Sequence, residues 1–355
     1  MRKNILVMIT TLFLAILSAC GNSTEETSSD SSKSNNSSKE LEMTEFEIVG
    51  VRDAQISSQQ IIADKLGYFE EEGLKVSNKL IESGPDIGPM VSGGSAPVSL
   101  QTNFMDIILS SNDVDVKIVA PLAQIAGTQA VVAGPKADIN EPKDLEGKTI
   151  GIPAGADVQI AINNMAEEYG VDLEKVKVAN LAPSDALTAL ESGDIDAMAA
   201  WEPFITKGIT AGGKLLFSGT SSELEGEPKE VDWMSVHSTL QITDKFLEEN
   251  PNTVKAIIRA LEKATDYINE NREEAIKILA PELHLSEEEL TEIMNRNVYD
   301  MTADESFIEG SNGQAVTDYL LSVGNIQSAP EQSEYIDLTL LKEVNPELVK
   351  AELAK

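Results

Sequence analysis

VKVANLAPSDALTALESGDIDAMAAWEPF (residues 176–204) repeats the order of elements found one hundred residues earlier in VSNKLIESGPDIGPMVSGGSAPVSLQTNF (residues 76–104). When the two stretches are aligned, Ser192-Gly193 falls on Ser92-Gly93. Each stretch reads as a short apolar strand, a Ser/Gly/Pro turn, a short helix closed by Ser-Gly, and a second strand with a polar or aromatic tip. A period of this length is too long for a solenoid and predicts two similar lobes.

Strands and helices also alternate outside the repeat. FEIVGV (46–51) predicts a strand, and an amphipathic helix is expected from about Ser58 until Gly73 stops it. KTIGIPAG (148–155) predicts a second opening strand, followed by a helix that Gly170 closes. This alternation indicates βαβ units, and therefore an α/β fold with mostly parallel sheets.

Two segments are expected to carry the chain between the lobes. IAGTQAVVAG (125–134) leads out of the first lobe, and WMSVHSTLQIT (233–243) leads back. The pattern is helical beyond this point, with an apolar stripe in NPNTVKAIIRALEKATDYI (250–268) and a capping box of Ser286 with Glu289. We expect these helices to pack on the first lobe.

The N-terminus has the pattern of an exported lipoprotein. MRKNILVMITTLFLAILSAC (1–20) combines two basic residues, an apolar run too short for a comfortable membrane span, and a small-residue end. LSAC resembles the lipobox of bacterial lipoproteins, in which the cysteine is lipidated. Cys20 is the only cysteine of the chain, which excludes internal disulfides and multi-cysteine metal sites. The serine-rich segment that follows predicts a flexible tether.

The charge balance limits the possible partners. The formal net charge is −33 at pH 7. Nucleic acid, anionic lipid and anionic wall surfaces would repel such a chain, so we expect no nucleic-acid partner. The simpler meaning of the charge is solubility outside the cell.

Several motifs together resemble the substrate-binding proteins of ABC transporters in the nitrate/sulfonate/taurine (NitT/TauT) family. They follow in the order GYFEEEGL (67–74), DLEGKTIGIP (144–153), LESGDIDAMAAWEPF (190–204), SVHSTLQITDKFLEENPNTVKAIIRALEKA (235–264) and YIDLTLLKE (335–343). The resemblance implies a type II periplasmic-binding-protein fold, in which two α/β lobes are joined by two crossovers and hold a solute in the cleft. It also implies a monomer without cofactor or metal that delivers its solute to the transmembrane subunits of a permease with their ATPase.

Together these observations divide the chain into six segments. We expect a lipoprotein signal peptide (1–20), a disordered tether (21–44), the first part of lobe one (45–130), lobe two (131–236), the helical return to lobe one (237–345) and a tail (346–355). A lipid on Cys20, palmitate included, would hold the protein at the extracytoplasmic face of the cell membrane.

Candidate ligand residues follow the strands. In open parallel sheets the ligand lies at the carboxyl ends of the strands, where loops lead into helices. Small, polar or aromatic residues at these places suit a few oriented hydrogen bonds beside an apolar wall. The expected ligand contacts are Gln55, Ser57, Ser58, Ser83, Gly84, Gln101, Thr102, Thr128, Gly155, Ala156, Asp157, Trp201 and Glu202. Each can instead be a cap or turn residue, Trp201 can be core, and Glu202 can cap the helix that begins near Pro203.

Asp157 bears on the charge of the solute. The loop in IGIPAGADVQ (150–159) has the form of an anion cradle, yet it contains a carboxylate. Asp157 can cap the following helix and fill that cradle from within. A bare oxyanion is disfavoured in either case, because a desolvated carboxylate repels it. We expect an amine or ring N–H toward lobe two, with any acidic end near Ser57, Ser83 and Thr102.

The sequence leaves two other classes of function as alternatives. An enzyme needs a nucleophile, an acid/base pair or a metal cluster, and the chain offers only His237, expected to be a packed strand residue, and His284, expected to be exposed. Relatives of this fold that make a thiamine precursor use a cysteine-rich segment, which this chain lacks. A surface-anchored sensory or adhesion lipoprotein would share the anchor and tether, but it would not require matching loops at a cleft.

Overall fold

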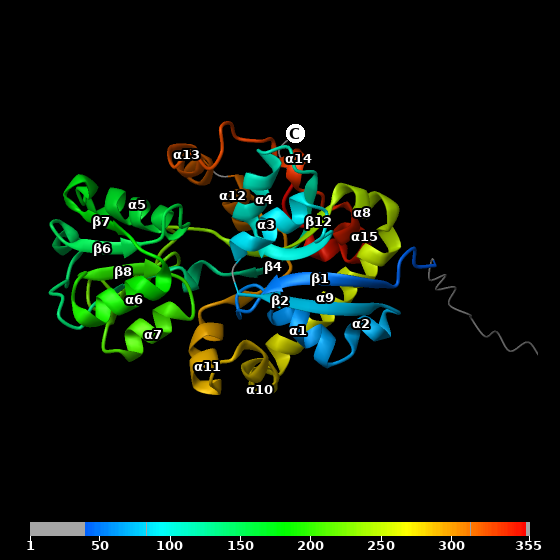
Figure 1. The fold of residues 1–355 in the computed structure, drawn as a ribbon, viewed down its shortest axis with the longest axis horizontal. Coiled ribbons are helices and arrows are strands. Elements are labelled where there is room, and N and C mark those ends of the chain that lie inside the picture. The colour runs from blue at the N-terminus through cyan, green and yellow to red at the C-terminus, as the bar shows by residue number, and fades with distance from the viewer. Residues whose placement is uncertain (1–39, 83, 313, 353–355) are drawn as a thin grey trace, which may run out of the picture. The chain divides into compact units, whose positions relative to one another are not determined.

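The described part of the chain is built around two β-sheets with helices on their faces (Figure 1). A computed structural model describes residues 40–82, 84–312 and 314–352. Cys20, the signal peptide and residues 21–39 of the predicted tether lie outside the described residues. Within the ranges described, no helix has the length and apolar character needed to span a membrane.

The first sheet has the strand order β13-β4-β12-β3-β1-β2. Its strands are β1 (Glu45–Val51), β2 (Lys75–Ile81), β3 (Val98–Thr102), β4 (Val116–Gln124), β12 (His237–Thr243) and β13 (Val298–Tyr299). β1 runs parallel to β2 and β3, whereas β12 runs antiparallel to β3 and β4. We call this sheet, with the helices packed on it, the first lobe.

The second sheet has the strand order β11-β10-β9-β5-β8-β6-β7. Its strands are β5 (Ala130–Ala133), β6 (Thr149–Ile152), β7 (Lys177–Asn180), β8 (Ala197–Ala200), β9 (Lys214–Ser218), β10 (Ser221–Ser222) and β11 (Lys229–Glu230). β6 runs parallel to β7 and β8, whereas β5 runs antiparallel to β8 and β9. This sheet with its helices is the second lobe.

The two lobes share one strand pattern, so the predicted pair of similar lobes is confirmed. β2-β1-β3-β12-β4 of the first sheet corresponds, strand for strand and in direction, to β7-β6-β8-β5-β9 of the second. The aligned stretches 76–104 and 176–204 supply β2 and β3 in one lobe and β7 and β8 in the other.

The sheets are mixed rather than mostly parallel, and the two crossover strands are the reason. β5 enters the second sheet directly from the first lobe, and β12 enters the first sheet on the way back. A strand that arrives from the neighbouring lobe starts at the edge where the parallel strands end. It therefore runs against them, and a βαβ pattern alone does not predict this.

Helices cover both sheets. Those that follow strands of the second lobe are α5 (Val158–Tyr169), α6 (Pro183–Ser192) and α7 (Phe204–Thr210). The others are α1 (Ser58–Lys65), α2 (Tyr68–Glu71), α3 (Ile87–Ser92), α4 (Asn103–Ser110), α8 (Asp244–Glu249), α9 (Pro251–Glu270), α10 (Arg272–Leu283), α11 (Glu287–Asn295), α12 (Glu305–Asn312), α13 (Gln314–Ser322), α14 (Gln332–Tyr335) and α15 (Thr339–Val344). Short 3-10 turns are η1 (Gly84–Asp86), η2 (Ala126–Thr128), η3 (Pro142–Leu145), η4 (Leu173–Lys175) and η5 (Pro346–Leu348).

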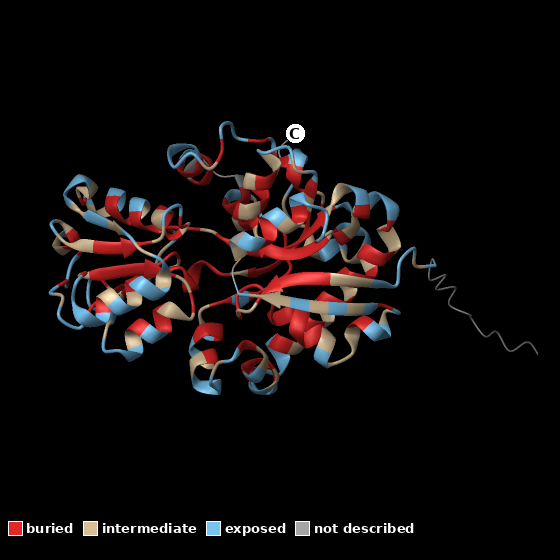
Figure 2. Cartoon of the chain, viewed as in Figure 1, coloured by how far each residue is buried: buried red, intermediate tan, exposed pale blue. Residues whose placement is uncertain are grey.

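The apolar stripe predicted for α9 lies inside the first lobe. Val254, Ile257 and Leu261 are fully buried, and α9 packs against α1 and β4. The predicted capping box is confirmed, because Ser286 Oγ accepts the Glu289 N–H while the Glu289 carboxylate accepts the Ser286 N–H. Figure 2 shows buried residues along the strands of both sheets and exposed ones on the outer faces of the helices.

The helix expected from Ser58 to Gly73 is divided in two. Gly67 adopts a left-handed φ of 75°, which ends α1 and starts α2 at a new angle. The change of direction brings Phe69 into the core, where it is 1% exposed. Periodicity alone did not predict the break, because the apolar spacing continues across it.

Candidate functional site

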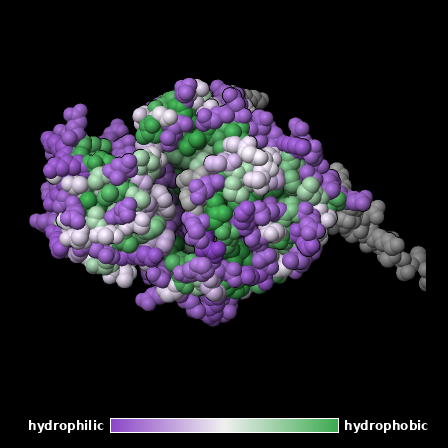
Figure 3. All heavy atoms as spheres, viewed as in Figure 1, coloured by the Kyte–Doolittle hydropathy of each residue, from purple (hydrophilic) through white to green (hydrophobic). Residues whose placement is uncertain are grey.

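Two equivalent loops carry much of the predicted site. The loop after β1 (52–57) leads into α1, and the loop after β6 (153–157) leads into α5, at corresponding places in the two sheets. Figure 3 shows a furrow between the surfaces of the two lobes on the viewed face. Both loops lie at the carboxyl ends of their strands, where α/β proteins bind ligands.

Gln55 and Glu202 come together from different lobes. The Glu202 backbone N–H donates to Gln55 Oε1 at 3.2 Å, and both residues are only 2% exposed. The sequence placed each of them at a strand end but could not pair them, because 147 positions separate them. The contact joins the loop after β1 to the end of β8.

The Glu202 side chain is occupied by protein groups. One carboxylate oxygen accepts the Thr206 N–H at 3.0 Å in the first turn of α7, and the other accepts from Arg296 Nη2. Burial raises the pKa of Glu202, and the Arg296 guanidinium opposes that rise. The capping alternative for Glu202 thus matches the structure, and Arg296 adds an ion pair that sequence reasoning missed.

The first lobe offers polar atoms that lack protein partners. Ser57 Oγ and Gln101 Nε2 are buried and have no hydrogen-bond partner among the described residues. Gly84 lies next to Gln101, since a Cβ at position 84 would be 3.8 Å from Gln101 Oε1. Thr102 is half-buried at the end of β3, and Ser83 lies outside the described residues. Buried polar groups normally have partners, so these atoms suit a bound solute.

Protein groups pin the loop that carries Ser57. Asp53 Oδ1 accepts the N–H groups of Gln55 and Ile56 at 3.0 and 2.7 Å, and burial raises the pKa of Asp53 to about 7. Tyr299 Oη donates to Ala54 O at 2.9 Å, and Ser58 Oγ donates to the same carbonyl at 2.7 Å. Ser58 therefore stabilises the loop from within α1.

In the second lobe, Asp157 directly precedes α5. Its Oδ1 accepts the Val158 N–H at 2.9 Å, so Asp157 caps the helix, as the alternative interpretation expected. Burial raises the pKa of Asp157 to about 6. Gly155, with φ of 73°, lies against Asn325, and Ala156 O accepts a hydrogen bond from Tyr319 Oη at 2.7 Å. The backbone of the expected cradle is thus partly covered by the C-terminal region.

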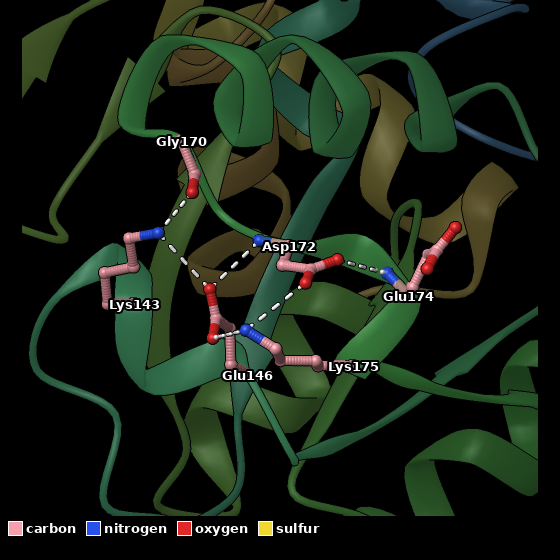
Figure 4. A network of polar contacts seen from close by, with 6 residues as sticks. All are labelled: Lys143, Glu146, Gly170, Asp172, Glu174 and Lys175. Atoms are coloured by element: carbon pink, nitrogen blue, oxygen red, sulfur yellow. Dashed lines mark hydrogen bonds and ion pairs between the residues drawn. The ribbon is translucent and has the colours of Figure 1, made fainter.

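The opposite end of α5 is held by a network of charged groups (Figure 4). Lys143 Nζ donates to Gly170 O at the helix terminus and pairs with Glu146, which also accepts the Asp172 N–H at 3.0 Å. This backbone hydrogen bond and the pairing with Lys175 lower the pKa of Glu146 to about 2. A shallow hollow of about 480 Å³ beside the network lies away from Asp157.

The remaining candidates, Thr128 and Trp201, and the two histidines differ in burial. Thr128 is fully buried, and its Oγ1 donates to Ile125 O and Asn297 Oδ1 at 2.7 and 2.9 Å, so it fixes the first crossover. Trp201 is half-buried against the core. His237 is buried edge-on to Phe307, and burial lowers its pKa to about 4, which confirms the packed interpretation. His284 is exposed at the end of α10, as predicted.

Comparison with known proteins then gives the family. The family model described as NMT1/THI5 like matches residues 57–275. The chain belongs to the NMT1/THI5-like family. This match begins at Ser57, the last residue of the loop after β1, and spans the whole second sheet and all of α9.

Two relatives and one solved structure support a two-lobed binding fold for this NMT1/THI5-like chain. A Bacillus subtilis (strain 168) protein named "Putative aliphatic sulfonates-binding protein" is 25% identical over 280 residues, covering 78% of this chain and 76% of that one. The taurine-binding periplasmic protein of Escherichia coli (strain K12) is 25% identical over 203 residues, covering 57% and 60%. The crystal structure of the Escherichia coli periplasmic aliphatic sulphonate binding protein has a TM-score of 0.70 at 16% identity, covering 83% and 92%.

Sequence reasoning missed four residues that shape the site of this NMT1/THI5-like chain. Asp53 had a local signal, because an aspartate two residues before Gln55 is typical of an Asx turn. Arg296, Tyr299 and Tyr319 reach the site only through the tertiary fold, and nothing in their own sequence neighbourhoods marks them. Among the described residues, no group of three or more His, Cys, Asp or Glu side chains is arranged to hold a metal ion.

Proposed function

We propose that the chain is the solute-binding component of an ABC importer. It captures a small organic solute between its two lobes and delivers it to the transmembrane subunits of a permease that works with an ATPase. The observation that carries this proposal is the pair of equivalent loops, 52–57 and 153–157, at the carboxyl ends of β1 and β6. Membership of the NMT1/THI5-like family and similarity to sulfonate-binding and taurine-binding proteins support it.

The polar groups favour a solute with an amine and an acidic end. Ser57 Oγ and Gln101 Nε2, both buried and without described partners, can donate to sulfonate oxygens in the first lobe. Asp157 supplies a carboxylate from the second lobe, and its helix cap uses one oxygen. A bare anion would meet that carboxylate, whereas an ammonium group would pair with it. The solute class is therefore an aminosulfonate such as taurine, or a compact ring with an N–H donor.

Affinity depends on contacts from both lobes at once. A solute that binds the closed form more tightly shifts the equilibrium toward that form. The Gln55 to Glu202 hydrogen bond already joins the lobes at one point, and solute contacts would add to it. We also propose that a lipid on Cys20 tethers the protein at the extracytoplasmic face. The role is binding and delivery rather than catalysis.

Replacing Asp157 by serine tests the solute class. Serine keeps a side-chain oxygen for the cap of α5 but removes the charge. We expect Asp157→Ser to weaken taurine binding about tenfold, or 1.4 kcal/mol, while ethanesulfonate, which lacks the amine, binds equally well or better. Isothermal titration calorimetry with both compounds measures the difference.

The matched control is Asp172→Ser, which changes an aspartate that caps η4 at the far end of the second lobe. This variant should bind taurine like the unmodified protein. If Asp157→Ser binds taurine with unchanged affinity, Asp157 only caps α5 and does not contact the solute. If no sulfonate, amine or pyrimidine in a broad screen raises the melting temperature of the unmodified protein, the importer role itself is contradicted, and the sensory or adhesion alternative gains.

A further inference from the structure

Two buried tyrosines make the same hydrogen bond to equivalent loops in the two lobes. Tyr299 Oη donates to Ala54 O at 2.9 Å in the loop after β1, and Tyr319 Oη donates to Ala156 O at 2.7 Å in the loop after β6. Tyr299 is 2% exposed and Tyr319 is 6% exposed. Both loops therefore depend on hydroxyl groups from the C-terminal region of the chain.

The two tyrosines differ in how they reach their loops. Tyr299 lies on β13, in the same sheet as β1, so its bond stays within the first lobe. Tyr319 lies on α13, which packs against α5 of the second lobe (Figure 1). Asn325, just beyond α13, adds a second contact, because a Cβ at position 155 would lie 3.2 Å from Asn325 Nδ2.

The chain on either side of α13 is fixed elsewhere. Ser311 Oγ, at the end of α12, accepts from Asn103 Nδ2 of α4 at 3.2 Å. Ser328 O, beyond α13, accepts from Ser111 Oγ, just after α4, at 3.2 Å. Ser235, in the return crossover, donates to Ser306 O at 2.8 Å. The segment that carries Tyr319 thus leaves the first lobe, touches the second-lobe loop and returns.

We propose that α13 is a strap between the lobes and that Tyr319 is a positioning residue, which holds the loop 153–157 in its solute-binding conformation while the lobes are together. The inference rests on the proposed function, since it assigns the loop a solute. It goes beyond that function by making the loop geometry depend on the relative position of the lobes. When the lobes separate, Ala156 O loses the Tyr319 donor and keeps the Gln159 N–H at 3.2 Å, and the strap loses its contact with Gly155.

The electrostatics of the contact support a donor role for Tyr319. Burial, together with the nearby Asp157 carboxylate, raises the pKa of the Tyr319 hydroxyl. The hydroxyl therefore keeps its proton and remains a hydrogen-bond donor near neutral pH. Within the loop, Gly155 adopts a left-handed conformation and the Ala156 N–H donates to Pro153 O at 3.1 Å. Tyr319 adds to these local bonds a donor that comes from outside the loop.

The test compares Tyr319→Phe with Tyr169→Phe. Tyr169 Oη donates to Glu225 Oε2 at 3.1 Å within the second lobe, so the control loses a tyrosine hydrogen bond that involves neither α13 nor its anchors. Spin labels on cysteines at Lys79 of β2 and Val178 of β7, both exposed and in different sheets, report the distance between the lobes. The full chain carries Cys20→Ser so that only these positions are labelled. Double electron-electron resonance is measured with and without taurine.

We expect Tyr319→Phe to broaden the distance distribution toward longer values without solute and to weaken taurine binding about fivefold. Tyr169→Phe should change neither. An unchanged distribution in Tyr319→Phe, or an equal change in both variants, overturns the strap. If Tyr319→Phe does not fold, Asn325→Ala takes its place with the same expected direction. If the unmodified protein does not bind taurine, the proposed solute fails, while the distances without solute still decide the strap.

Discussion

At the scale of single residues, Glu202 and Asp157 show how far a side chain's role depends on distant neighbours. Both are carboxylates near strand ends of the second lobe, and both accept a backbone N–H at the start of a helix. Glu202 is neutralised by Arg296, whereas burial raises the pKa of Asp157 to about 6. The sequence predicted both caps as alternatives, but only the fold brings in Arg296, from 94 positions away.

His237 predicts how stability changes with pH. Its pKa is lowered by burial from 6.5 to about 4, so protonation favours the unfolded chain. The neutral, buried imidazole of His237 contributes fully to the free energy of unfolding above about pH 6.5, and this contribution is lost as the pH falls toward 4. The shift corresponds to roughly 3 kcal/mol. We expect His237→Phe to flatten the free energy of unfolding between pH 6.5 and 4, measured by urea denaturation.

The control for this prediction is His284→Gln, which removes the exposed histidine at the end of α10. It should follow the curve of the unmodified protein. If the free energy of unfolding of His237→Phe falls with pH as steeply as that of the unmodified protein, groups other than His237 cause the pH dependence.

At the scale of elements, the sequence was most informative where periodicity and caps act locally. The strand at 46–51, the helix closed by Gly170 and the stripe of α9 all correspond to elements of the structure. The mixed direction of the sheets was not predicted, because it depends on which lobe β5 and β12 come from. The break at Gly67 was missed, because both halves of the predicted helix keep their apolar spacing. The two loops that we expect to contact the solute follow β1 and β6. The groups that hold these loops come from distant parts of the chain.

The capping box of α11 allows a test at this scale. Ser286→Ala removes the oxygen that accepts the Glu289 N–H at 3.2 Å, and such a loss costs about 1 kcal/mol of stability. The matched control is Ser184→Ala in the first turn of α6, whose side chain is exposed and does not cap that helix. Guanidinium denaturation should separate the two variants. Equal effects would mean that the cap of α11 contributes nothing measurable.

At the scale of the whole molecule, the described residues form two lobes of one pattern that are joined by two covalent crossovers. Hydrogen bonds between Gln55 and Glu202 and between Tyr319 and Ala156 add non-covalent links between lobes. A solute bound by both loops would add further links, so binding and closure are expected to be coupled.

Solute binding should therefore raise stability and compact the protein together. With taurine at about one hundred times its Kd, we expect a gain of about 2.7 kcal/mol in the free energy of unfolding. The radius of gyration from small-angle X-ray scattering should fall under the same conditions. A gain in stability with an unchanged radius of gyration would mean that the solute is held by one lobe alone.

The order of the strands along the chain also sets an order of assembly. β5 to β11 form one uninterrupted stretch between Ala130 and Glu230, so every strand of the second sheet has been synthesised before β12 begins. The first sheet needs β12 at its centre, between β3 and β4, and these strands pair only across a large sequence separation. During synthesis the inserted lobe can fold while the outer one still lacks its middle strand. An amino-terminal fragment that ends near residue 230 should thus contain a complete second sheet and a first sheet that still lacks β12.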